Sequence, residues 1–162
     1  EHFDTIWYDE DKPLGTGGGL SLLKGKLSET FFLTNCDLLI FTDYEKLLRF
    51  HRESGSAVTM VCAEKRVTIP YGVVETGEGG VITAMREKPA FQFLTNTGLY
   101  LVEPEVLEDI GEDEVIGFPD IIERQRRKGR RVSAYTVGEE DWLDMGQLDE
   151  LEKMRERLYG KP

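Results

Sequence analysis

The stretch Phe31–Asp37 reads FFLTNCD: a short apolar run that ends in three polar residues. Such a run is typical of a strand buried on both faces of a sheet. Residues 43–50 then carry apolar side chains at helical spacing, with Asp43 placed as an N-cap and Gly55 as the stop. A second apolar run covers 57–63. Strand, helix and strand in this order indicate a βαβ unit, so we expect an α/β fold with a parallel sheet here.

The sequence pattern changes after this unit. Residues 71–75 and 81–85 flank the glycine-containing stretch 76–80, which is a hairpin signature. Further on, the pattern predicts strands over 96–102 and 131–137 and helices over 104–110, 119–128 and 147–158. We therefore expect a mixed, mostly parallel sheet that is interrupted by an antiparallel excursion.

Composition excludes several classes of protein. The chain has 162 residues, with 20 Lys and Arg against 31 Asp and Glu, so its net charge is −11. A nucleic-acid partner is disfavoured, because duplex binders are normally basic. No apolar run approaches the ~18–20 residues of a membrane helix, so no membrane partner is expected. The two cysteines, Cys36 and Cys62, give neither a disulfide framework nor a zinc spacing, which indicates a reducing cytoplasm.

The beginning of the sequence predicts a fragment. The chain does not start with Met, and Phe3 and residues 6–8 give it a strand-like character almost at once. Natural chain ends usually have a polar lead-in, because they tend to fray. We expect a chain that starts inside a domain; a trimmed chain with an ordered N-terminal strand is the alternative.

Two stretches can contact phosphate. Residues 12–20 contain a glycine run, and glycines before a helix can present N–H groups to an anion. The run is neither a P-loop nor a dinucleotide fingerprint, so a flexible turn and a ligand loop both fit. Later, Glu87 places a hydroxyl acceptor beside Lys88, a compact cation that suits phosphate. A charged strand end before Pro89 is the plainer interpretation.

Two aspartates can hold a metal. Asp37 follows the strand 31–34 at its carboxyl end, the edge where α/β sheets bind ligands. Asp144 follows the aromatic-apolar pair Trp142-Leu143. Mg²⁺ takes oxygen ligands and often only one or two protein carboxylates plus phosphate, so these two residues could form one magnesium site. A turn aspartate at 37 and a helix N-terminal aspartate at 144 remain the alternatives.

Taken in order, six segments resemble the sugar-1-phosphate nucleotidyltransferases, most closely the guanylyltransferase-like branch that serves mannose, heptose or glucosamine phosphates. They are residues 13–19, 35–37, 71–75, 87–89, 96–100 and 142–146. The resemblance implies the Rossmann-like nucleotide-diphospho-sugar transferase fold, truncated at the N-terminus. Residues 1–162 would then be a single partial domain that lacks the first βαβ portion with its triphosphate loop.

The resemblance also implies an activity, the coupling of a sugar-1-phosphate to an NTP with release of pyrophosphate, and a cofactor, Mg²⁺. The residues it assigns are Leu14, Gly15 and Thr16 against the nucleobase, Asp37 and Asp144 on the metal, Gly72, Glu87, Asn96 and Thr97 at the sugar, and Lys88 on the sugar phosphate. Asp37, Lys88 and Asp144 would be the catalytic groups.

Further expectations follow from the fragment interpretation. The isolated chain should be inactive, and an apolar face should be exposed where the missing strands would pack, which leaves a homo-oligomer open. A non-catalytic, sugar-phosphate-binding or regulatory relative is the alternative function.

Overall fold

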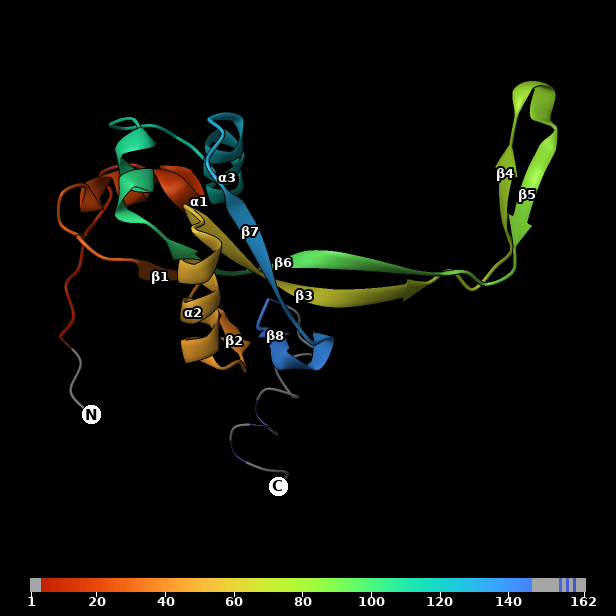
Figure 1. Cartoon of the computed structure of the whole chain (residues 1–162), viewed down its shortest axis with the longest axis horizontal. Helices are drawn as coiled ribbons and strands as arrows, with labels where there is room; N and C mark the ends of the chain where they lie inside the picture. Colours follow the sequence, from red (N-terminus) through yellow and green to blue (C-terminus); the bar gives the residue numbers. More distant parts are fainter. Residues whose placement is uncertain (1–3, 147–154, 156, 158, 160–162) are drawn as a thin grey trace. The chain divides into compact units, whose positions relative to one another are not determined.

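The computed structural model describes residues 4–146 together with 155, 157 and 159 (Figure 1). The helix predicted over 147–158 lies almost entirely outside these residues. The chain divides into two compact units, each assembled from separate segments. The first unit comprises Glu1–Cys36, Thr42–Val61 and Gly98–Tyr135, and the second comprises Asp37–Phe41, Cys62–Thr97 and Thr136–Pro162.

The sheet has the strand order β1-β6-β3-β7. Its strands are β1 (Phe31–Thr34), β3 (Val58–Thr68), β6 (Ala90–Val102) and β7 (Val132–Val137). Strands β1 and β6 pair antiparallel, with Phe31 opposite Val102. The apolar runs of the sequence thus form strands as expected, although β3 and β6 are longer than the patterns that predicted them.

Two backbone hydrogen bonds at Ala57 fix the other strand directions in the first unit. The N–H of Glu103 donates to the Ala57 carbonyl at 3.0 Å, so the end of β6 lies beside the start of β3. The N–H of Ala57 donates to the Arg131 carbonyl at 2.8 Å, so β3 and β7 start together and run parallel. Strands β1 and β3 therefore run in the same direction with β6 between them. The prediction of a mixed α/β sheet is confirmed.

Helix α2 (Tyr44–Ser54) begins and ends where its sequence predicts. The Asp43 side chain accepts a hydrogen bond from the Lys46 N–H at 3.0 Å, which satisfies one of the free donors of the first turn. Gly55 ends the helix in the left-handed conformation, with φ at 61°. Both signals are local, which is why the pattern alone was sufficient.

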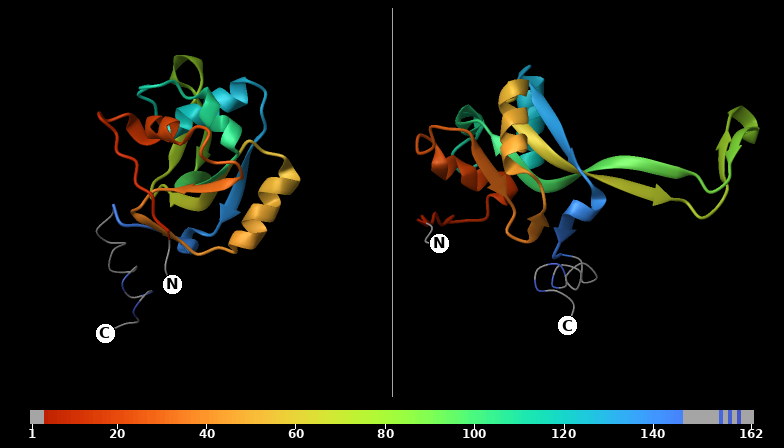
Figure 2. Two further views of the ribbon diagram at one scale, coloured as in Figure 1. Left: turned by 90° about the vertical axis from the view of Figure 1, so that its left-hand side faces the viewer. Right: turned by 60° about the horizontal axis from the view of Figure 1, so that its bottom comes forward.

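The other helical segments of the first unit gather at one of its ends, as Figures 1 and 2 show. They are α1 (Gly15–Gly18), η1 (Gly19–Leu23), η3 (Pro104–Asp109) and α3 (Phe118–Arg127). Their apolar side chains join those of the sheet in one core, whose buried members are Val58, Tyr100, Val102, Val106, Leu107, Ile110, Phe118, Ile121 and Ile122. None of the helices within the described residues is long and apolar enough to cross a membrane.

The second unit contains the predicted hairpin. Strand β4 (Val73–Thr76) pairs antiparallel with β5 (Ile82–Arg86), with an irregularity between Glu75 and Thr76, and the short helix η2 (Glu78–Gly80) lies between them. The unit also holds β2 (Leu38–Ile40), which pairs antiparallel with β8 (Trp142–Asp144) after the short helix η4 (Glu139–Asp141).

Two features of the fold differ from the sequence-based prediction. Strands β2 and β8 were not expected, because three residues are too few to show a period. Conversely, the strand-like beginning is wrong for the part that the structure describes: residues 4–10 form no strand, and Ile6 and Trp7 are exposed. β-propensity measures how well a side chain fits a pleated neighbour, and it builds no strand where no neighbour is present.

Candidate functional site

Strands β2 and β8 bring Asp37 and Asp144 together. Leu38 lies directly opposite Asp144 in the ladder, and the Met145 N–H donates to the Asp37 carbonyl at 2.9 Å. Asp37 lies in the turn before β2 rather than in the strand, so the alternation of the pleat does not fix the face of its side chain. The two aspartates thus meet at one end of a two-stranded ladder, although they lie far apart in the sequence.

The side chains of this pair have different surroundings. Asp37 is exposed, whereas Asp144 is half-buried and its Oδ1 accepts a hydrogen bond from the Gly146 N–H at 2.8 Å. Among the described residues, no group of three or more His, Cys, Asp or Glu side chains has the arrangement of a metal site. Two carboxylates without a third protein ligand fit Mg²⁺, which usually keeps waters and phosphate oxygens in its remaining positions.

A second group of predicted residues, Gly72, Glu87 and Lys88, lies beside the hairpin. A Cβ added to Gly72 would lie 3.1 Å from Oε2 of Glu87, so the absence of a side chain at 72 leaves the room that the Glu87 carboxylate occupies. The Lys88 N–H donates to the Tyr71 carbonyl at 3.3 Å. Lys88 itself is exposed and has φ at 44°, a left-handed conformation that is uncommon for residues other than glycine. These contacts hold Gly72, Glu87 and Lys88 in one small group.

Asn96 and Thr97 lie next to each other in β6, where successive side chains point to opposite faces. Asn96 is exposed and Thr97 is buried, with 3% of its surface accessible. One face of the strand therefore carries only one of the two side chains.

The first predicted group, Leu14 to Thr16, lies against the segment 116–118 in the first unit. The Ile116 N–H donates to the Leu14 carbonyl at 2.9 Å, and the Gly17 N–H donates to the Ile116 carbonyl at 3.0 Å. The Thr16 hydroxyl accepts a hydrogen bond from the Phe118 N–H at 3.1 Å, so it caps the first residue of α3. This part of the glycine run is held by backbone contacts and is not a flexible turn.

The side chain of Glu10 covers the other flank of the same run. Its Oε2 accepts a hydrogen bond from the Leu14 N–H at 3.0 Å. A Cβ added to Gly19 would lie 2.0 Å from Oε1 of Glu10. Sequence reasoning missed this residue, and its position four residues before Leu14 was the only available signal.

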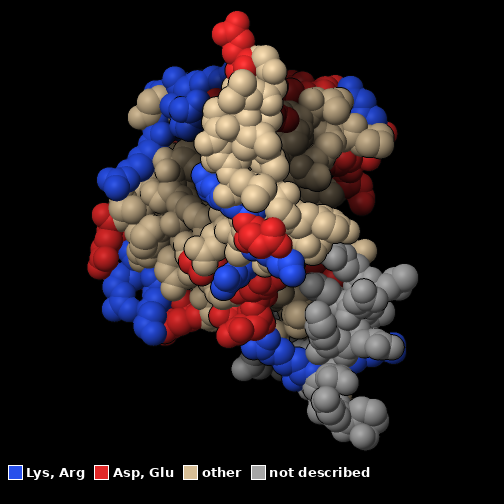
Figure 3. Space-filling model, turned by 90° about the vertical axis from the view of Figure 1, so that its right-hand side faces the viewer, with Lys and Arg blue, Asp and Glu red and all other residues tan. Residues whose placement is uncertain are grey.

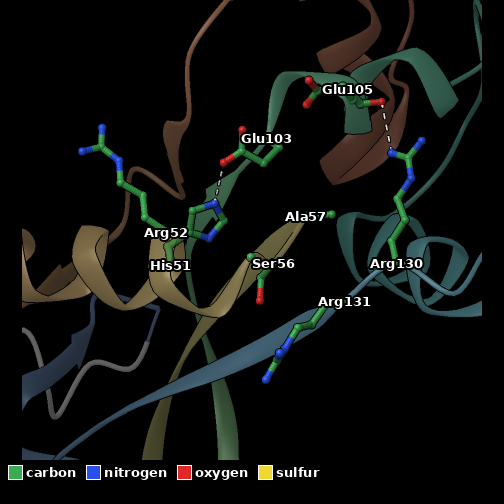
Figure 4. Close-up of a pocket in the computed structure, with 9 residues that line it drawn as sticks. His51, Arg52, Ser56, Ala57, Glu103, Glu105, Arg130 and Arg131 are labelled. Carbon is green, nitrogen blue, oxygen red and sulfur yellow. Dashed lines mark hydrogen bonds and ion pairs between the residues drawn. The ribbon is translucent and has the colours of Figure 1, made fainter.

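A cavity of about 620 Å³ in the first unit lies elsewhere (Figure 4). His51, of which 1% is exposed, is among the residues that line it. Nδ1 of the His51 ring lies 2.7 Å from Oγ1 of Thr59, and Nε2 lies 2.9 Å from Oε1 of Glu103. Figure 4 shows the side chains of Arg52, Arg130 and Arg131 pointing in different directions rather than toward a common point. No residue predicted for the site lines this cavity, and His51 is a buried residue of α2.

The hairpin side of the second unit is largely uncharged, as Figure 3 shows. Met85 and Ile82 on β5 are 71% and 62% exposed, and the neighbouring Val81 and Val74 are exposed as well. The ladder also has a polar contact: Arg86, which lies opposite Val73, forms an ion pair with Glu75 at 3.0 Å. The hairpin therefore exposes several apolar side chains at the surface.

The sequence matches the family model described as nucleotidyl transferase over residues 7–159. Among curated proteins, the mannose-1-phosphate guanylyltransferase catalytic subunit beta of Drosophila pseudoobscura pseudoobscura is 35% identical over 156 residues, covering 89% of this chain and 40% of that protein. The UTP–glucose-1-phosphate uridylyltransferase of Synechocystis sp. is 30% identical over 152 residues, covering 85% of this chain and 38% of that protein. The chain thus spans about 40% of the length of these relatives.

A solved structure has a similar fold. HddC from Yersinia pseudotuberculosis aligns with a TM-score of 0.65 at 20% identity, covering 92% of this chain and 64% of that one. At this level of identity the likeness concerns the fold alone, and it agrees with the expected α/β architecture.

Proposed function

Because the chain belongs to the nucleotidyl transferase family, we propose that it is part of an enzyme that couples a sugar-1-phosphate to a nucleoside triphosphate and releases pyrophosphate. The proposed product is a GDP-sugar, since the relatives named mannose-1-phosphate guanylyltransferase are among the most similar. We also propose that the two compact units belong to one nucleotidyltransferase domain, as the family match runs through both.

One observation supports this function most strongly: the pairing of β2 with β8, which sets Asp37 beside Asp144. Two carboxylates at the end of a ladder suit a divalent cation that must also bind phosphate oxygens. We propose Mg²⁺ for this position and the cytoplasm as the compartment, the latter because Cys36 and Cys62 are both free thiols.

The proposed reaction needs positioning and charge neutralisation rather than a protein nucleophile. An oxygen of the sugar-1-phosphate attacks the α-phosphorus of the triphosphate, the new P–O bond forms, and the bond to the β-phosphate breaks as pyrophosphate leaves. A bound Mg²⁺ would supply Lewis-acid neutralisation of the phosphate charge. Asp37 and Asp144 would hold that ion.

The chain's other predicted residues would bind and orient the two substrates. Leu14, Gly15 and Thr16 would lie against the nucleobase. On the sugar side, the contacts around Gly72 support a group in which Glu87 accepts sugar hydroxyls and Lys88 holds the phosphate. Asn96 and Thr97 would line the sugar pocket from β6.

The experiment that tests this function is a substrate panel with the full product of the gene that encodes this sequence. Pyrophosphate release is measured for each pair of nucleoside triphosphate and sugar-1-phosphate, with and without Mg²⁺. We expect one pair, with GTP, to exceed the others clearly. Asp37→Asn and Asp144→Asn should each lower kcat at least ~100-fold, as the loss of a preorganised charge at the reacting phosphate does.

Asp141→Asn is the matched control. Asp141 lies at the other end of the same ladder, where its carboxylate forms an ion pair with Arg157 and its carbonyl accepts from the Phe41 N–H. This variant should keep the rate within about twofold. Binding of sugar phosphate without any turnover would instead favour a non-catalytic relative, and no binding of either substrate would refute the proposal.

A further inference from the structure

The segment Glu114–Phe118 forms a rail along the glycine run. It supplies both backbone partners of the run, because Ile116 accepts from Gly17 and donates to Leu14. It also approaches the run so closely that side chains have no room. A Cβ on Gly15 would lie 2.8 Å from the Ile116 carbonyl oxygen, and a Cβ on Gly18 would lie 2.1 Å from the Glu114 carbonyl oxygen.

Residues 114–117 of the rail belong to no helix or strand, and only Phe118 is the first residue of α3, so the position of the rail needs support. Glu114 provides it through its side chain. Oε2 of Glu114 accepts from the Gly111 N–H at 2.8 Å and from Arg124 at 3.1 Å, while Oε1 accepts from the other guanidinium nitrogen of Arg124 at 2.5 Å. The pairing is bidentate, which is the strong and directional form of an arginine–carboxylate contact.

Arg124 is itself well held. It projects from α3, and its Nη1 also donates to the Asp109 carbonyl at the end of η3. The side chains of Glu114 and Arg124 are each 30% exposed, so water screens the pair less than a fully exposed one. The hydrogen bonds from Arg124, together with the one from Gly111, lower the pKa of Glu114 from 4.5 to about 2. The carboxylate is therefore charged throughout the neutral range.

We propose that Glu114 and Arg124 are positioning residues for nucleotide binding, fixing the Leu14–Gly19 segment through the rail 114–118. This inference rests on the proposed function, in which Leu14, Gly15 and Thr16 lie against the nucleobase. Neither Glu114 nor Arg124 needs to touch a substrate. The pair acts through the backbone of Glu114 and Ile116, whose carbonyl oxygens define where the glycine run can lie.

The expected effect is selective. A displacement of a substrate-contacting segment by about 1 Å can cost up to ~100-fold in rate or affinity, even when the mutation lies outside the site. Breaking the Glu114–Arg124 pair should shift the nucleotide loop and leave the groups around Gly72 and Asp37 in place, because those belong to the second unit.

The test compares Glu114→Gln with Glu123→Gln in the full gene product. Glu123 is a matched control, since it is also a glutamate with a pKa near 2, and it pairs with Arg126 and Arg127 on the same helix without touching the rail. KM is measured separately for the best nucleoside triphosphate and for the best sugar-1-phosphate of the panel. Urea denaturation checks that both variants are folded.

Glu114→Gln should raise the KM for the triphosphate by roughly tenfold. The KM for the sugar phosphate and kcat should stay within about twofold, and Glu123→Gln should change none of the three. Arg124→Gln should reproduce the effect, and the double variant should be no worse than either single one, because each removes the same contact. In parallel, amide exchange of residues 14–19 should become faster in Glu114→Gln alone.

Other outcomes overturn the inference. Equal triphosphate KM values for Glu114→Gln and Glu123→Gln would refute it and leave the proposed function intact, since the enzyme would still turn over. A parallel rise in both KM values would show that the pair is merely structural. If the unmodified protein binds no triphosphate at all, the proposed function fails and this inference fails with it.

Discussion

Two glycine-rich segments of this chain look alike in the sequence and differ in their physical reason for being glycine. Gly17–Gly19 lies in the first unit, where a Cβ on Gly18 would lie 2.1 Å from the backbone oxygen of Glu114. Added Cβ atoms on Gly17 and Gly19 would displace the side-chain ends of Ile121 and Glu10. Gly79 and Gly80 lie in the turn of the hairpin, where a Cβ would meet nothing within 4 Å. There the backbone itself requires glycine, with φ at 72° and 80°.

The packing of Gly17–Gly19 shows that a run of glycines in a sequence is not by itself evidence of a flexible segment. The first run is packed between a carboxylate and a backbone rail, and we propose that it serves as a platform for the nucleotide. The second run only reverses the chain. The exposed hairpin is flanked by the predicted sugar contacts Gly72 and Glu87, in keeping with the tendency of binding loops to come from the less stable parts of a fold.

Gly18→Ala should have the largest effect on stability. Its Cβ would lie 2.1 Å from a backbone oxygen of Glu114 and 2.7 Å from Cβ of Leu14, so the rail or the helix must move. We expect the free energy of unfolding to fall by about 3 kcal/mol, the upper range for overpacking. Urea denaturation measures it, and a loss below about 1 kcal/mol would show that the run is loosely packed after all.

Gly80→Ala tests the other segment. The new side chain meets no neighbour, and only the left-handed backbone opposes it, at a cost of roughly 1–2 kcal/mol. Amide exchange in β4 and β5 should accelerate accordingly, while exchange in α2 stays unchanged. Gly80→Asn should recover most of the loss, because asparagine tolerates this conformation; equal effects of the two substitutions would mean that sterics rather than φ decide.

Lys88 can be compared with Gly79 and Gly80, because it adopts a left-handed φ of 44° without being glycine. Such strain persists where function demands the side chain. Lys88→Gly should stabilise the hairpin by about 1 kcal/mol and raise the KM for the sugar phosphate. Lys88→Ala is the control, since it removes the charge and keeps the strain. If both substitutions leave the sugar-phosphate KM unchanged, Lys88 does not hold the phosphate.

The smallest effect concerns pH. Because the folded pKa of Glu114 is lowered from 4.5 to about 2, its contribution to stability is complete above pH 4.5 and is lost as the pH falls toward 2. Exchange of the Gly17 amide should accelerate over this window in the unmodified protein. In Glu114→Gln the carboxylate is absent, so this acceleration, corrected for the intrinsic pH dependence of exchange, should be smaller. Identical profiles would rule out a role of the Glu114 charge in fixing the glycine run.

Part of the fold could be predicted because its signals are local. Asp43 and Gly55 end α2 by contacts within one turn, and the apolar run at 31–34 forms a strand. The hairpin followed from its glycines and alternating flanks. Strands β2 and β8 could not be predicted, since three residues acquire strand geometry only when a partner from a distant part of the chain lies beside them.

The amino-acid sequence was sufficient to predict the α/β fold class, the family to which the chain belongs and which residue types could bind a metal and a phosphorylated sugar. Tertiary structure alone decided that Asp37 lies near Asp144 and that Gly72 lies under Glu87. It also packs the run Gly17–Gly19 closely against distant parts of the chain. The physical reason is that composition and period describe each segment with its own neighbours, whereas close approach depends on which distant backbone atoms arrive within van der Waals distance.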